Sequence, residues 1–166
     1  CGLQAYDGRE TAPAAATENL FMGTDGKPMA FIDAVVGGRS VGVLGAVKML
    51  ELAHQQHGKL AWSTLFQPAI QLASEGFKVS PRMNTLLQSE VHLKKDAVAA
   101  AYFYDASGKP WPVGYMLKNP EYAEVLKLIA ANGSKALHEG EVAQAVVNKV
   151  QSHPTNSGKL SIADLA

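Results

Sequence analysis

Apolar residues recur at helical spacing along most of the chain. Between Val43 and Gln56 they fall near positions i, i+4, i+7 and i+11, which predicts an amphipathic helix. Gly58 follows this stretch, and we expect it to end the helix in the left-handed conformation that glycine adopts easily. Related patterns predict further helices over 62–74, 80–94, 119–132 and 141–150, and a helical turn over 134–138. The chain is therefore expected to be predominantly helical, with roughly six or seven helices and one or two strands.

Particular residues in three segments indicate where a helix begins, where it is interrupted, or whether the segment is a helix or a strand. Ser80 and Pro81 supply a hydroxyl N-cap and a proline at the first helical position, so they mark a helix start. Pro68 lies inside the 62–74 segment and is expected to split it, because proline removes a backbone hydrogen bond and clashes with the preceding turn. Residues 97–104 include three aromatic side chains, and their pattern leaves helix and strand both open.

The N-terminal part of the chain is less regular. Residues 1–6 are predicted to form a short strand, 13–22 a short helix and 25–28 a turn. A single strand in a helical chain needs a partner, so we expect it to pair with a sheet supplied by another part of the protein. At the other end, Ser161 and Asp164 form a capping-box pattern that marks a helix start in the last residues, which suggests a truncated chain.

Composition excludes several classes of protein. The chain has 166 residues, one domain's worth, with 47% apolar and 18% charged residues, which is typical of a folded globular protein. Acidic and basic residues balance at 15 each, so nucleic acid and anionic membranes are poor partner hypotheses. No apolar run approaches the roughly 20 residues of a membrane span. No signal-peptide pattern is present, so we expect that such a leader is absent or already removed.

The single cysteine is Cys1, so no internal disulfide can form. Cys1 followed by Gly2 is compatible with the lipid-bearing start of a mature bacterial lipoprotein. The simpler interpretation, which we favour, is that the chain begins at Cys1 without lipidation, for example because it was cleaved there.

Two groups of residues suggest chemistry but do not complete a motif. The glycines at 37, 38, 42 and 45 resemble a phosphate loop only in composition, because Gly42 is followed by Val43 and Leu44 and not by lysine and a hydroxyl residue. We therefore expect these glycines to permit close backbone approach at a helix start. His54 and His57 have a spacing that can share a metal ion, but no third ligand is evident, so they are interpreted as solvated.

No nucleophile–base set is visible in the chain. Its remaining histidines, which stand in no catalytic motif, are His92, His138 and His153. By itself the segment is not expected to carry out catalysis.

One arginine stands out as a candidate for substrate binding. Arg9 and Glu10 follow a turn signal, Asp7-Gly8, and precede Pro13. The planar fork of an arginine in such a place can bind a carboxylate through two parallel charge-assisted hydrogen bonds. On spacing alone, however, a surface Arg–Glu pair worth less than about 1 kcal/mol is the better interpretation.

A family resemblance changes that interpretation. Residues 7–14, DGRETAPA, resemble the D-x-R-E-x-A-P-A stretch of the gamma-glutamyltranspeptidases, and residues 40–47 resemble the family's S/A-x-G-V-P-G-T-V block. Residues 65–80 and 158–166 are similar to two further blocks, P-A-I-x-L-A-x-x-G-F-x-V-S and G-x-L/I-t-x-x-D-L-A, in the family's order. The chain departs from the second block at Leu44 and Ala46, where the family usually has proline and threonine.

The resemblance implies a fold and an activity. The fold expected is α+β and mainly helical: a helical layer with one or two edge strands of an αββα N-terminal-nucleophile hydrolase, residues 1–166 being a single partial domain of the large subunit. The complete enzyme transfers a γ-glutamyl group from glutathione-like donors to water, amino acids or peptides, without a metal or organic cofactor. Arg9 would bind the donor's α-carboxylate. The nucleophilic threonine would lie elsewhere, so this segment alone is expected to contain no catalytic residue and to be inactive.

The resemblance also implies partners and a location. The partners are the γ-glutamyl donor, the remainder of the large subunit and the small subunit produced by self-cleavage. Members in bacteria are commonly periplasmic or secreted. Two alternatives stay open at this point: a non-enzymatic helical binding module, and a segment of a related N-terminal-nucleophile acylase with another acyl donor.

Overall fold

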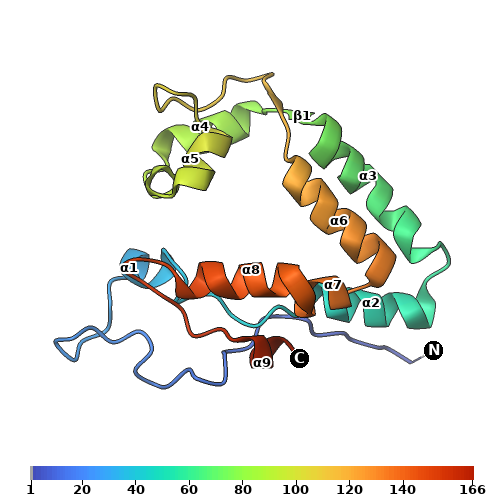
Figure 1. The fold of residues 1–166 in the computed structure, drawn as a ribbon, viewed down its shortest axis with the longest axis horizontal. Helices are drawn as coiled ribbons and strands as arrows, with labels where there is room; N and C mark the ends of the chain where they lie inside the picture. Colours follow the sequence, from blue (N-terminus) through green and yellow to red (C-terminus); the bar gives the residue numbers. More distant parts are fainter. Residues whose placement is uncertain (1) are drawn as a thin grey trace. The chain divides into compact units, whose positions relative to one another are not determined.

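The computed structural model describes residues 2–166, so the interpretations that concern Cys1 lie outside the described residues. The chain divides into two compact units (Figure 1). Unit 1 comprises the residues up to Phe66 together with Lys127–Ala166, and unit 2 comprises Gln67–Leu126. Each unit is described by itself.

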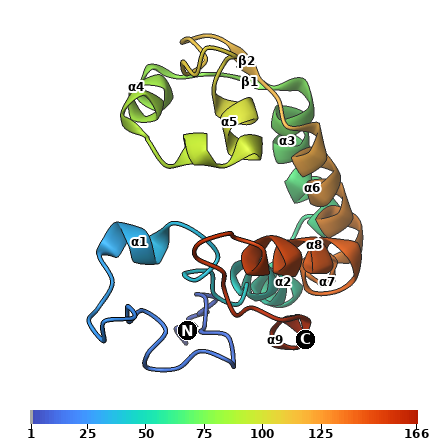
Figure 2. The same ribbon diagram turned by 60° about the vertical axis from the view of Figure 1, so that its left-hand side comes forward.

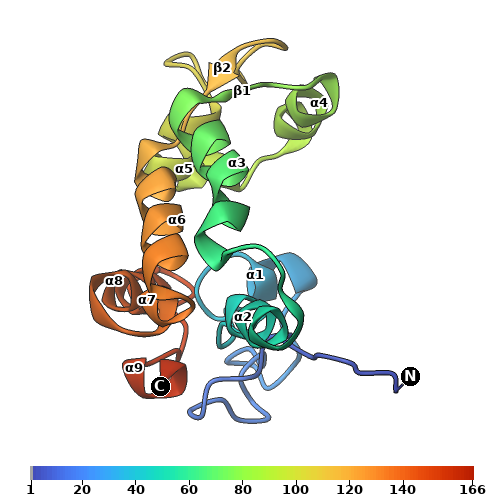
Figure 3. The same ribbon diagram turned by 90° about the vertical axis from the view of Figure 1, so that its right-hand side faces the viewer.

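The core of unit 1 forms against the inward face of one helix, α8 (Gly140–Gln151). Its helices are α1 (Phe31–Val35), α2 (Ala46–His57), α7 (Lys135–His138), α8 and α9 (Ile162–Leu165), with the start of α3 (Trp62–Glu75) and the end of α6 (Pro120–Asn132). The core consists of Ala143, Val147 and Val150 on α8, packed with Leu160 and Leu165. Figure 3 shows α9 beside α7 and α8, consistent with the contact between α8 and α9.

The inward face of α8 was only partly predictable. The apolar spacing over 141–150 predicts an inner face of Val142, Ala145, Val146 and Val150; of these, Val150 is buried and Ala145 is exposed. Ala143 and Val147 take the central places, with 0% and 4% of their surface exposed. The stripe is rotated from the predicted one because α8 packs against the segment that carries Leu160 and Leu165.

Asn156 joins two loops of unit 1. Its Nδ2 donates hydrogen bonds to the carbonyl oxygens of Val36 at 2.8 Å and Asp33 at 2.9 Å, and its backbone carbonyl accepts from the backbone N–H groups of Gly38 and Arg39. The residue is 4% exposed. These bonds satisfy carbonyl groups at the end of α1 that the short helix leaves unpaired.

Replacing Asn156 with aspartate is expected to destabilise the protein by about 3 kcal/mol. A carboxylate oxygen would face carbonyl oxygens in place of the donating amide, and a charge would be buried. Thermal unfolding of the complete protein measures the effect. Asn19→Asp, at an exposed turn position, is the matched control and should change the melting temperature little; equal shifts for the two variants would contradict the assignment.

Unit 2 combines short helices with a two-stranded ladder. Its elements are β1 (Phe77–Lys78), α4 (Pro81–Ser89), the 3-10 helix η1 (Leu93–Lys95), α5 (Ala97–Phe103) and β2 (Met116–Leu117), with the end of α3 and the start of α6. Strands β1 and β2 lie side by side (Figure 2) and are antiparallel, with Phe77 opposite Leu117. Among the residues buried here are Val79, Leu87, Tyr104 and Leu117.

Local helix signals were confirmed where side chains cap the backbone. The hydroxyl of Ser80 accepts a hydrogen bond from Met83 N at 3.1 Å, as expected of an N-cap. Asp96 caps α5 by accepting from the N–H groups of Val98 and Ala99, which decides that residues 97–103 are helical. Helix α4 ends at Ser89, earlier than predicted, because the Glu90 carboxylate accepts from the N–H of His92.

Two N-terminal predictions were wrong. Residues 2–6 form no strand, and the extended backbone that follows contributes only an isolated bridge between Thr11 and Val43. Residues 13–22 form successive turns, closed for example by hydrogen bonds from Ala16 N to Pro13 O and from Leu20 N to Thr17 O. A short segment with few buried side chains lacks the packing that stabilises a helix. The turn predicted over 25–28 is present, with Gly26 at φ +72°.

Two predicted effects of helix-breaking residues also failed. Helix α3 continues through Pro68. Pro68 and Thr64 are both exposed, so water can satisfy the Thr64 carbonyl that the proline leaves without a donor. Gly58 does follow α2, but with φ −63° and ψ 140° it is extended and not left-handed. Gly133 at φ +70°, after α6, shows the left-handed glycine that ends a helix.

The predominantly helical fold class with two short strands is confirmed. The strands are β1 and β2, and not the predicted N-terminal strand. In the part of the chain that the structure describes, no helix is long and apolar enough to cross a membrane.

Candidate substrate-binding segment

Arg9 lies on an extended stretch, residues 7–14, which we call the clamp segment. The Asp7 carboxylate accepts a hydrogen bond from Arg9 N at 3.0 Å and so shapes the backbone just before the arginine. Arg9 Nε lies 3.3 Å from Glu10 Oε1, and the Arg9 side chain is 81% exposed. The backbone N–H of Glu10, and then the charge of Arg9, lower the pKa of the Glu10 carboxyl. The guanidinium is thus charged, accessible and weakly held by its neighbour.

Two glycines of the block at 40–47 pack closely against the backbone of the clamp segment. Val43 N donates to Thr11 O at 2.9 Å, which joins the two stretches. A Cβ atom at Gly42 would lie 2.8 Å from Thr11 O, and one at Gly45 would lie 2.7 Å from Gly8 O. Real Cβ atoms do not approach backbone oxygens so closely, so these positions require glycine. The expected close backbone approach is therefore confirmed, and the neighbour is the clamp segment itself.

The last block of the chain also reaches the clamp segment. Asp164 Oδ1 accepts a hydrogen bond from Ala14 N at 2.8 Å, across 150 positions of sequence. Its other oxygen, Oδ2, accepts from the backbone N–H of Ser161 at 2.8 Å and from the Ser161 hydroxyl at 2.7 Å, completing the predicted capping box. The hydrogen bond from Ala14, followed by that from the Ser161 hydroxyl, lowers the pKa of the Asp164 carboxyl.

The histidines have ordinary hydrogen-bond roles. Nε2 of His57 lies 2.7 Å from the Tyr6 hydroxyl, and Nε2 of His54 lies 2.8 Å from the Leu60 carbonyl oxygen. Nδ1 of His138 contacts the Leu165 carbonyl, and His153 accepts from the backbone N–H of Asn156. Within residues 2–166 no group of three or more His, Cys, Asp or Glu side chains is placed to hold a metal ion.

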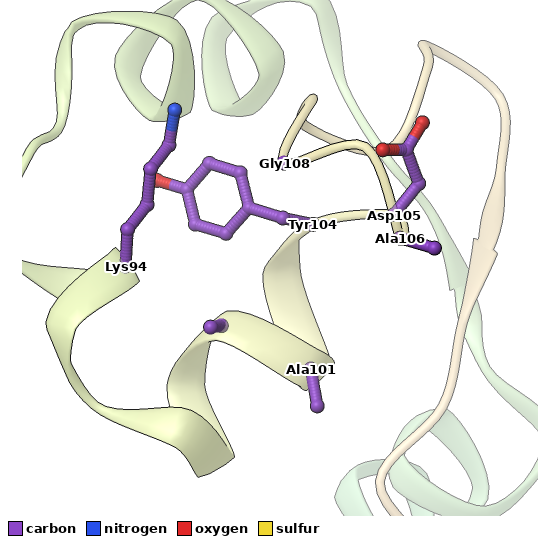
Figure 4. Close-up of a pocket in the computed structure, with 7 residues that line it drawn as sticks. Lys94, Ala101, Tyr104, Asp105, Ala106 and Gly108 are labelled. Carbon is purple, nitrogen blue, oxygen red and sulfur yellow. The ribbon is translucent and has the colours of Figure 1, made fainter.

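Unit 2 contains a shallow cavity of about 450 Å³ (Figure 4). Tyr104 and Lys94 form one wall, with Lys94 Nζ 4.8 Å from the centre of the tyrosine ring. The Tyr104 hydroxyl donates to the Leu87 carbonyl, and burial raises its pKa. Tyr104 comes from the aromatic segment noted in the sequence, but the cavity is lined by none of the candidate binding or metal-ligating residues predicted there.

Three of the four sequence blocks are therefore brought together in unit 1. The blocks at 7–14, 40–47 and 158–166 meet around the clamp segment. The block at 65–80 lies mostly in unit 2, where it forms most of α3, all of β1 and the Ser80 cap. Sequence reasoning found Arg9 and the capping box, but it did not connect Asp164 with Ala14, since no local pattern marks that contact.

Comparison with known proteins identifies the family to which these sequence blocks belong. The family profile described as Gamma-glutamyltranspeptidase matches residues 2–166. The chain is 38% identical over 151 residues to Scoloptoxin SSD14 of Scolopendra dehaani, covering 90% of this chain and 25% of that protein. It is 35% identical over 150 residues to Glutathione hydrolase 2 of Arabidopsis thaliana, covering 89% of this chain and 24% of that protein.

A solved structure supports the same assignment. The gamma-glutamyltranspeptidase of Helicobacter pylori matches with a TM-score of 0.86 and 27% identity, over 96% of this chain and 45% of that chain. The chain belongs to the gamma-glutamyltranspeptidase family. It spans about a quarter of the length of the relatives named above.

Proposed function

We propose that the complete protein is a gamma-glutamyltransferase and glutathione hydrolase, and that Arg9 binds the α-carboxylate of the γ-glutamyl donor. The observation that carries this proposal is an exposed arginine in one family block whose backbone is held in place by two others. Glu10 engages only Nε of Arg9, so the two terminal nitrogens can form the parallel pair of hydrogen bonds that a carboxylate accepts.

The proposal also covers the parts of the enzyme that lie outside these 166 residues. The complete protein is a proenzyme that cleaves itself, and the nucleophilic threonine of its small subunit lies outside these 166 residues. Residues 1–166 form a partial domain of the large subunit. We place the complete protein in the periplasm or outside the cell, as members of the family commonly are in bacteria.

Uncovered apolar faces support the need for further parts. Although all of α2 is described, none of its residues is buried, and Leu50 on its apolar stripe is 54% exposed. On α3, Leu65 is 48% and Leu72 is 54% exposed. Apolar area of this kind is usually covered in a folded protein. The remainder of the large subunit and the small subunit are the occupants we assign to these faces.

Three anilides test the function in the complete, mature protein. γ-Glutamyl-p-nitroanilide should release p-nitroaniline, and release should accelerate when a dipeptide acceptor is added. The 4-aminobutanoyl anilide, which lacks only the α-carboxylate, should react at least about a hundredfold more slowly at equal concentration, since a fully desolvated carboxylate–arginine pair is worth about 3 kcal/mol.

The outcomes separate the competing functions. Equal rates with and without the carboxylate would contradict carboxylate recognition. Preference for the glutaryl anilide, which keeps the carboxylate but lacks the amine, would indicate a related acylase. Turnover of none of the three would favour a non-enzymatic binding protein.

A further inference from the structure

The Asp164 side chain links the clamp segment to the C-terminal end of the described chain through hydrogen bonds to both of its carboxylate oxygens. One oxygen accepts from Ala14 N at 2.8 Å, and the other accepts from Ser161 N and Oγ. Both oxygens therefore have donors, and the donors to the two oxygens belong to different segments. The carboxylate acts as a bridge between the clamp segment and α9.

The α9 end of this bridge is firmly anchored. Leu160 and Leu165, on either side of Asp164 in sequence, are 0% and 1% exposed in the core formed with α8. Gln151 Nε2 donates to the Leu160 carbonyl at 2.8 Å. His138 Nδ1 lies 2.8 Å from the Leu165 carbonyl, which can only accept, so this nitrogen donates. Asp164 is thus presented by a turn that is fixed on two sides.

The clamp end has few other attachments. The backbone hydrogen bond between Val43 N and Thr11 O holds the middle of the segment, and Pro13 is buried. Beyond Ala14, the chain continues into the exposed turns over 17–22. Without the bond to Ala14, motion of those turns would be separated from Arg9 by the buried Pro13, the Val43–Thr11 hydrogen bond and the packing at Gly42 and Gly45. A small displacement of a bidentate arginine is costly, because both of its hydrogen bonds depend on orientation.

We propose that Asp164 is a positioning residue for donor binding, which holds the Ala14 N–H and thereby keeps Arg9 where it meets the donor's α-carboxylate. This inference rests on the proposed function of Arg9. Asp164 does not touch the donor. Its carboxylate makes a charge-assisted bond to a backbone N–H, which is stronger than a bond between neutral groups, and such a bond suits a permanent tether.

Two variants break the bond from opposite sides in the complete protein. Asp164→Ala removes the acceptor. Ala14→Pro removes the donor at an exposed position that follows Pro13 in a turn closed by Ala16 N and Pro13 O, the place in a turn where proline is favoured. Each should raise KM for a γ-glutamyl donor roughly fivefold to tenfold, with kcat within about twofold, since charge-assisted hydrogen bonds are moderately strong.

Ser161→Ala is the matched control. It removes the hydroxyl that Asp164 Oδ2 accepts from, and so weakens the capping box, but it leaves the bond from Ala14 to Oδ1. KM should stay within about twofold of the parent, although stability falls by an amount typical of a lost cap. The double variant of Asp164→Ala and Ala14→Pro should raise KM no further than either single change, because both break the same bond.

Three results would overturn the proposal: an unchanged KM in the folded single variants, an equal rise in KM for Ser161→Ala, or additive effects in the double variant. If Asp164→Ala does not fold, Ala14→Pro decides alone. Arg9→Lys separates this inference from the proposed function. If Arg9→Lys raises KM and the tether variants do not, only the positioning role fails. If Arg9→Lys leaves KM unchanged, the proposed function itself fails.

Discussion

Replacing Arg9 with lysine in the complete protein is expected to raise KM for a γ-glutamyl donor roughly thirtyfold or more and to leave self-cleavage intact. Lysine keeps the positive charge but cannot form two parallel hydrogen bonds with a carboxylate. Truncating one partner of a hydrogen-bonded charge pair costs about 2–5 kcal/mol, and about 2 kcal/mol already corresponds to this change in KM. Steady-state kinetics measure KM, and gel electrophoresis of the subunits monitors self-cleavage.

Arg82→Lys is the matched control for this experiment. Arg82 is also an exposed arginine, but it lies in the first turn of α4 in unit 2 and is not expected to meet the donor. Its replacement should leave KM unchanged. A normal KM in Arg9→Lys would show that Arg9 does not bind the carboxylate, and failure of self-cleavage would show that the change disturbs folding instead.

Replacing Gly38 with alanine is expected to destabilise the protein by about 3 kcal/mol, near the upper end for overpacking. An added Cβ would run into the Val150 carbonyl oxygen and would lie 2.8 Å from Gly158 N. Those two atoms already form a hydrogen bond of 2.8 Å between α8 and the loop after it. Because the obstruction is backbone on both sides, rotation of a side chain cannot relieve it.

Thermal unfolding of the complete protein checks the prediction for Gly38. Gly2→Ala is the matched control, because among the described residues nothing lies within 4 Å of a Cβ added there. The melting temperature should fall markedly for Gly38→Ala and stay constant for Gly2→Ala. A Gly38→Ala protein that melts like the parent would mean that α8 and the loop can separate at little cost.

Several signals that act between neighbouring residues were reliable, although those at Pro68 and Gly58 were not. The start of α4 at Ser80 and Pro81, the end of α6 at Gly133 and the capping box at Ser161 were all predictable, because each depends on bonds or backbone angles within a few residues. Family membership was also readable from four short blocks in order, and the matching profile confirms it. These features need no knowledge of what lies across the fold.

Elements that depend on partners were not predictable in the same way. The expected strand over 1–6 is absent from residues 2–6, since a ladder needs a second strand beside it. Helix α3 passes through Pro68 where Thr64, whose carbonyl loses its donor, is an exposed residue, and exposure is a property of the fold. Periodicity located the apolar stripe of α2 but not what covers it.

The candidate site, too, has one feature that the sequence indicated and others that depend on the tertiary structure. The sequence by itself singled out Arg9 as the candidate for binding a carboxylate, because an arginine fork offers two parallel donors and Arg9 stands in the family's first block. Tertiary structure alone decided how that arginine is held. The clamp segment packs closely against the backbone of Gly42 and Gly45, and sequence spacing does not predict this contact. Asp164 accepts a hydrogen bond from Ala14, 150 positions away in the sequence. Contacts between distant segments depend on how the chain packs, and local sequence carries no record of that.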